Sequence, residues 1–138
     1  MSAAHFRGLI VLSVLLAVCG AAVDTLFPTL IPQSLSVALE NEPPHNIFDN
    51  LVLSFLLFVP LGVLAIASTV GLFFLKRWAR SLALASTALG FGMYPFLGPS
   101  VGSAWASAFS DASSLAWGAV LAIAYFSPLR DRFSSVSR

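Results

Sequence analysis

The side chain in this sequence with the clearest chemical potential is Asp111, which lies inside the long apolar stretch 104–126. A carboxylate at membrane depth is costly unless it is paired, hydrated or protonated, so its position indicates a functional site. Ser107 and Ser114 are four residues before it and three after it, and on a helix they share its face and can offer hydrogen bonds. Three interpretations remain open: a proton or cation site, a structural hydrogen-bond hub between helices, and a wetted position in the outer interface.

A second set of polar side chains falls where the predicted helices reach one end of the molecule: Asp24, His45, Asp49 and Tyr94. His45 and Asp49 are four residues apart, a spacing that can present two metal ligands on one helix face. Pro44 leaves the start of that helix undefined, so the metal-site signal is weak, and a solvated polar rim is the simpler explanation of the set. With one cysteine and two histidines in the chain, we expect neither a structural metal site nor a cofactor.

The composition of this chain is typical of a protein that lies in a lipid bilayer. Of its 138 residues, 58% are hydrophobic and only 9% are charged, whereas soluble domains carry about a quarter charged residues. The mean hydropathy is +0.91. The partner that the composition predicts is therefore the lipid bilayer, and the net charge of +1 gives no indication of nucleic-acid binding.

Apolar stretches close to the length of about 20 residues that crosses a bilayer predict an all-α integral membrane protein. We expect a single domain, 1–138, built as an up-and-down bundle of four transmembrane helices. Pro60 is expected to bend the second, which is the longest. The predicted spans are 6–26, 47–75, 78–97 and 104–126.

The basic residues predict the orientation of these spans. All seven fall on one side of a four-span arrangement: Arg7, Lys76, Arg77, Arg80, Arg130, Arg132 and Arg138. Short loops rich in Lys and Arg stay in the cytoplasm, which places both termini and the tail 127–138 inside, and the loop 27–46 outside. We expect the cytoplasmic (inner) membrane of a bacterium.

Two segments allow more than one interpretation. Residues 32–41 have apolar side chains at helical spacing, which indicates either a short interfacial helix in the external loop or an irregular apolar loop. The first span also resembles a signal peptide cut after Ala22, or less closely a lipoprotein signal at Cys19. We expect it to remain as a span, because its apolar run and flanking residues are long enough.

The fourth span carries a small residue at every fourth position, namely at Ala106, Ser110, Ser114, Gly118 and Ala122. Such rows let helices approach closely in lipid. We interpret this row as packing within the bundle, with a homodimer seam as the alternative. Trp117 is interpreted as a packing residue.

No enzyme is predicted, because the sequence holds no nucleophile–base set, phosphate-binding loop or paired-cysteine motif. The favoured hypothesis is a non-catalytic subunit or accessory protein of a membrane complex, with a membrane-protein partner or as a homo-oligomer. The alternative is an oligomeric small transporter or channel that uses Asp111 as a proton or cation site. A third hypothesis is an enzyme that acts on lipid from the outer rim.

Overall fold

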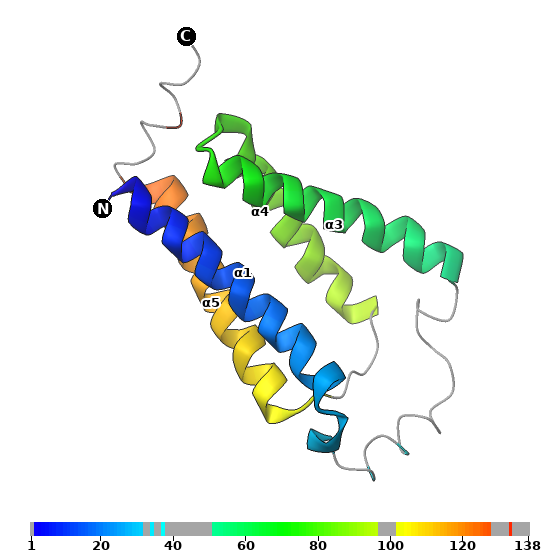
Figure 1. Ribbon diagram of the computed structural model, residues 1–138. Coiled ribbons are helices and arrows are strands. Elements are labelled where there is room, and N and C mark those ends of the chain that lie inside the picture. The colour runs from blue at the N-terminus through cyan, green and yellow to red at the C-terminus, as the bar shows by residue number, and fades with distance from the viewer. Residues whose placement is uncertain are drawn as a thin grey trace.

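The computed structural model of the chain is all-helical (Figure 1), and it describes residues 2–31, 34, 37, 51–96, 102–127 and 133. Its helices are α1 (Ala3–Leu26), α3 (Leu51–Phe73), α4 (Arg77–Met93) and α5 (Ala104–Phe126), with short 3-10 helices η1 (Pro28–Leu30) and η3 (Tyr94–Phe96). These bounds follow the predicted spans to within a few residues, and the fourth agrees at both ends. Pro60 lies inside α3, which continues through it. Most of the predicted loop helix 32–41, together with His45 and Asp49, lies outside the described residues.

Three of these helices, α1, α3 and α5, are long and apolar enough to cross a membrane. The fourth, α4, has 17 residues, which is about 25 Å at the helical rise and shorter than the roughly 30 Å hydrocarbon core. It also begins with Arg77 and contains Arg80 in its first turn. Length and composition therefore indicate a membrane protein with three candidate spans, and α4 is not one of the three.

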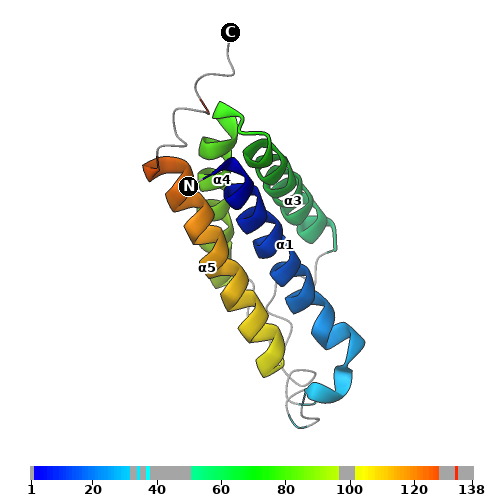
Figure 2. The same cartoon turned by 60° about the vertical axis from the view of Figure 1, so that its left-hand side comes forward.

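The four helices associate as two antiparallel pairs. α1 packs along α5, and α3 packs along α4, whereas contacts between the two pairs are sparse. Figures 1 and 2 show the same pairing from two directions. Helices that are distant in the sequence thus form one pair (α1 and α5), and helices that are consecutive form the other.

A tight turn joins α3 to α4. Leu75 adopts a positive φ of 56°, the Lys76 N–H donates to the Gly71 carbonyl (2.8 Å) and the Leu75 N–H donates to the Leu72 carbonyl (3.0 Å). This is the Schellman pattern that ends many helices. A Cβ on Gly71 would lie 2.6 Å from the Cβ of Ala79, so glycine is required there for α3 and α4 to approach each other.

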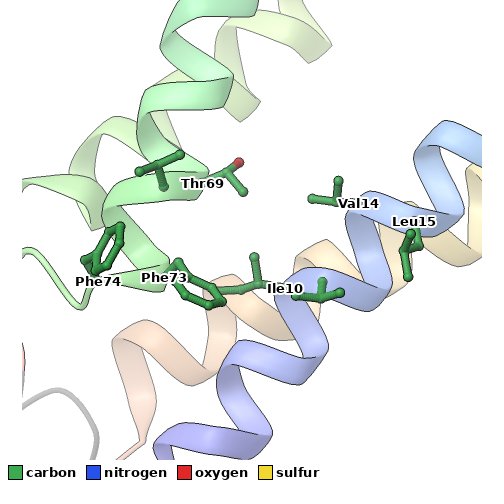
Figure 3. Close-up of a pocket in the computed structure, with 8 residues that line it drawn as sticks. Ile10, Val14, Leu15, Thr69, Phe73 and Phe74 are labelled. Atoms are coloured by element: carbon green, nitrogen blue, oxygen red, sulfur yellow. The ribbon is translucent and has the colours of Figure 1, made fainter.

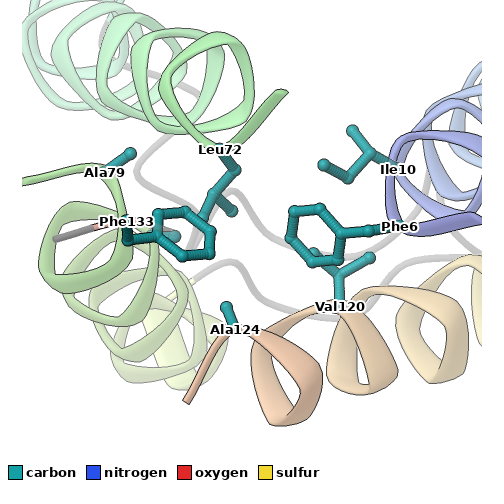
Figure 4. Packing of buried hydrophobic residues seen from close by; sticks show 8 residues of the cluster. Phe6, Ile10, Leu72, Ala79, Val120, Ala124 and Phe133 are labelled. Atoms are coloured by element: carbon teal, nitrogen blue, oxygen red, sulfur yellow. The ribbon is translucent and has the colours of Figure 1, made fainter. Parts of the chain in front are cut away.

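The buried core lies at the end of the molecule that holds the start of α1, the α3–α4 turn and the end of α5 (Figure 4). Phe6 meets Phe133 edge to face, with ring centroids 6.1 Å apart. The fully buried apolar side chains around them are Ile10, Leu72, Ala79, Ala83, Val120 and Ala124. We call this region the packed end. From it the two helix pairs diverge toward the opposite end (Figure 1).

Two arginines link the helix pairs at the packed end. Arg7 of α1 donates from Nε to the carbonyl of Phe73 in α3 (3.1 Å), and Arg80 of α4 donates from Nη1 to the carbonyl of Ala124 in α5 (3.3 Å). Both acceptors lie in the last turn of a helix, where the dipole favours a positive charge. Each helix pair therefore contributes one arginine that caps a helix of the other pair.

Candidate functional site

Asp111 lies on the outside of the bundle. It is exposed on α5, as are Ser107 and Ser114, and the helical rise places it about 10 Å from the start of that helix. The neighbouring Leu115 is 77% exposed, and open space surrounds the Cα of Gly118. The three residues predicted as a polar site therefore share one face, which we call the α5 face, and this face points away from the other helices.

Of the predicted outer rim, only Asp24 and Tyr94 lie in the part of the chain that the structure describes. Tyr94 is exposed and stacks on Phe91, with ring centroids 6.0 Å apart. Asp24 has a different environment at the start of α5. Within the described part of the chain, no group of three or more His, Cys, Asp and Glu residues is arranged to hold a metal ion.

Asp24 caps α5 from the end of α1. Its Oδ2 accepts a hydrogen bond from the Ser103 N–H (3.0 Å), while the Ser103 hydroxyl accepts from the Ala106 N–H (3.2 Å). Its other oxygen, Oδ1, is buried and has no hydrogen-bond partner among the described residues. Carboxylates are favoured at helix N-termini, where N–H groups lack intrahelical partners, so the geometry gives Asp24 a structural role.

A cavity of about 250 Å³, open on one side, lies between the helices and is lined by residues of all four. Its polar lining consists mainly of hydroxyl groups. The lining residues are Ser13, Val14 and Ala17 of α1, Ala65 and Thr69 of α3, Ser86 and Thr87 of α4, and Ser113 and Trp117 of α5. We call it the hydroxyl cavity.

Hydrogen bonds across the hydroxyl cavity connect the helices. Ser113 donates to the carbonyl of Ser13 (2.9 Å), which links α5 to α1. The indole Nε1 of Trp117 donates to Oγ1 of Thr87 (2.9 Å), which links α5 to α4. Trp117, predicted as a packing residue, contacts the core cluster and is also a donor in this network.

A second cavity adjoins the first between α1 and α3. It measures about 420 Å³ and is lined by apolar side chains apart from Thr69 (Figure 3). Val14 and Thr69 line both cavities, so the two are neighbours along the gap between the helix pairs. We call this one the apolar cavity.

Sequence reasoning did not identify either cavity. The hydroxyl residues are spread over four separate stretches, and each stretch alone resembles a span with an occasional serine or threonine. One signal was available: Ser13, Thr69, Thr87 and Ser113 all lie well inside their apolar stretches rather than at the ends. Polar groups at such a depth tend to face the interior of a bundle, so they could have been assigned to one layer.

The row of small residues on α5 divides between two environments. A Cβ on Gly20 of α1 would lie 3.0 Å from the Ser110 hydroxyl and 3.3 Å from the Ala106 carbonyl. Ala106 is buried and Ser110 is exposed, and this first part of the row packs against α1, in agreement with the predicted packing within the bundle. Ser114, Gly118 and Ala122 are exposed and extend along the α5 face.

Comparison with known proteins gives no match: no protein family fits the sequence, and no characterised protein or solved structure is significantly similar to it.

Proposed function

We propose that the chain crosses the membrane four times, with both termini in the cytoplasm of a bacterial cell. The packing of α4 along α3 supports its role as the fourth span, because α3 is itself long and apolar enough to cross. η3 continues α4 to Phe96 and adds to its length. The described basic residues, Arg7, Lys76, Arg77 and Arg80, all belong to the packed end, and basic segments stay in the cytoplasm.

Within that topology we propose a non-catalytic accessory subunit that docks onto another membrane protein through the α5 face. The observation that supports this role is the exposure of Asp111 about two turns into a membrane-spanning helix. In lipid such a carboxylate is costly without a partner. Ser107, Ser114 and Gly118 provide hydroxyls and space on the same face, which suits close approach of a second helix.

The complementary partner is a transmembrane helix that carries a Lys, Arg, His or side-chain amide at the depth of Asp111. A symmetric dimer seam through this face would bring one copy's Asp111 toward the other's, because an isologous interface pairs a patch with itself. Two carboxylates repel each other strongly at low dielectric. Charge complementarity therefore favours a different protein over a second copy, and over a pore of several copies lined by Asp111.

Crosslinking from the α5 face tests this role. A photoreactive phenylalanine analogue replaces Leu115 in cells, and the matched control replaces Leu56, which is 69% exposed on α3. We expect irradiation to give one discrete adduct from position 115 only. The captured protein, identified by mass, should contain a transmembrane helix with a cation or amide, and Asp111→Leu should abolish the adduct while Asp111→Glu retains it.

Three results would contradict the accessory role. An adduct of twice the chain mass would instead support a homo-oligomer and the transporter or channel hypothesis. Equal adducts from positions 115 and 56 would indicate unspecific collision in the membrane. An adduct that persists in Asp111→Leu would show that the carboxylate is not what the partner recognises.

A further inference from the structure

The hydroxyl cavity has an excess of hydrogen-bond acceptors. Each hydroxyl has one proton and two lone pairs, and here the protons are used on backbone carbonyls. Thr69 donates to Ala65 (2.8 Å) and Ser86 and Thr87 donate to Ala83 (3.1 and 2.7 Å). Ser13 donates to Ile10 (2.9 Å) and Ser113 donates to Ser13 (2.9 Å). The lone pairs that remain can accept from a group inside the cavity.

The lining carries no charged side chain, and Trp117 already donates its N–H to Thr87. A phosphate or carboxylate would find no cation there, and burying a charge without a partner is strongly unfavourable. The complementary group is therefore a neutral hydrogen-bond donor.

The apolar cavity adds a requirement for hydrocarbon. It extends between α1 and α3 from the shared residues Val14 and Thr69 toward Phe73 and Phe74, as Figure 3 shows. Apolar cavities do not hold ordered water. Val11 and Phe74, at its margins, are exposed, so a molecule dissolved in the bilayer can enter sideways between the helix pairs.

We propose that the two cavities together bind an uncharged lipid that bears a hydroxyl group. The hydroxyl of the lipid donates to lone pairs in the hydroxyl cavity, foremost that of Thr69, which lines both cavities. Its hydrocarbon chain occupies the apolar cavity. The apolar cavity, with about 420 Å³, is in the range of small-molecule sites, roughly 300–1,000 Å³, and the adjoining hydroxyl cavity adds about 250 Å³. This site is separate from the α5 face and does not depend on the role proposed for it.

Quenching of Trp117 fluorescence tests the proposal directly. The chain has three tryptophans, so Trp78→Phe with Trp105→Phe leaves Trp117 as the only reporter. The purified chain in mild detergent is titrated with a long-chain primary alcohol brominated on its chain, and in parallel with the methyl ether of that alcohol. We expect saturable quenching by the alcohol at roughly fivefold lower concentration than by the ether, the effect of about one net hydrogen bond.

Variants then locate the site. Thr69→Val and Ser86→Ala should each weaken quenching by the alcohol roughly threefold to tenfold and leave quenching by the ether unchanged. Thr25→Val is the matched control, since this hydroxyl donates to Ala22 near the end of α1, outside both cavities, and it should change neither. Equal quenching by alcohol and ether would overturn the proposal, as would quenching that does not saturate. So would equal losses in the Thr69 and Thr25 variants, and Ser86→Ala decides the matter if Thr69→Val does not fold.

Discussion

At the scale of single residues, the two aspartates Asp24 and Asp111 differ in burial and in hydrogen-bond partners. Asp24 lies partly buried against the start of α5, where the Ser103 N–H donates to it. Asp111 is exposed within α5 with hydroxyls of its own helix nearby. The first has a partner inside the chain, and for the second we propose a partner outside it. This contrast separates a structural carboxylate from one available for recognition.

Replacing Asp24 tests the structural role. Asp24→Ala leaves the Ser103 N–H without its acceptor and removes a negative charge at a helix N-terminus, which should lower the free energy of unfolding by roughly 1–2 kcal/mol. Asp24→Asn keeps an acceptor oxygen and should lose less than half of that amount. The measurement is reversible unfolding of the purified chain in mixed micelles, with Thr25→Val as a control for general disturbance of this helix end. A stability of Asp24→Ala equal to that of the parent would show that the cap contributes nothing.

The position of Asp111 could be predicted from the sequence, whereas the contact made by Asp24 could not. The depth of Asp111 follows from counting residues into an apolar stretch, so it could be identified as the exceptional acid. The cap made by Asp24 joins residues 79 positions apart, and no local pattern shows which helix start an acid at the end of α1 will meet. For the same reason the network of Trp117 with Thr87 was not predicted, although a packing role was.

At the scale of helices, α1 and α5 approach each other closely at Gly20, where a small residue is required. Gly20 is buried against Ser110 and Ala106, whereas Gly8 in the same helix has nothing within 4 Å of where a Cβ would lie. Packing rather than water exclusion drives helix association in lipid. We therefore expect the close approach at Gly20 to contribute to the stability of this pair.

Matched alanine substitutions in α1 test the contribution of this close approach to stability. Gly20→Ala should destabilise the chain by roughly 1–3 kcal/mol, the cost of overpacking, because the new methyl group forces α1 and α5 apart. Gly8→Ala should be neutral or stabilising by up to about 1 kcal/mol, since alanine has the higher helix propensity. Unfolding in mixed micelles compares the two. Equal effects of both changes would mean that propensity, and not packing, governs this helix.

Helix positions were predictable, but helix pairing was not. Runs of apolar residues bounded by charges and prolines predicted the bounds to within a few residues. A helix that is apolar on nearly every side does not indicate which side faces a neighbour, so the pairing of α1 with α5 had no signal in the hydropathy pattern. The two cavities are lined by residues of several helices, so they could not be predicted without knowing which helices pair.

At the scale of the whole molecule, the two arginine caps and the core gather at one end. Arg7 and Arg80 join the helix pairs there, and the same residues are part of the basic set that predicts orientation. In the proposed topology, the arginines that join the helix pairs thus belong to the same basic set that orients the chain in the membrane.

Cysteine labelling tests the four-span orientation. In a Cys19→Ala background, Thr29→Cys follows the end of α1 and Ser135→Cys lies in the predicted cytoplasmic tail. A thiol reagent that does not cross membranes should label position 29 in intact cells, and position 135 only after the cells are opened. Labelling of both positions in intact cells would contradict the four-span orientation, because it would indicate an even number of spans between them, as would protection of both.

The divergence of the helix pairs also has a mechanical consequence. In the proposed four-span topology, a bundle that is joined at one end and parted at the other takes up different areas in the two leaflets of the bilayer. A change in the angle between the helix pairs changes the area that the protein occupies in the leaflet around the parted end. The work of this change is the lateral pressure in that leaflet multiplied by the change in area. Because an environment shifts a conformational equilibrium through its differential interaction with the two states, lipids that raise the pressure in that leaflet should press the pairs together and narrow the gap between α1 and α3. We therefore expect the width of that gap to depend on the composition of the surrounding membrane.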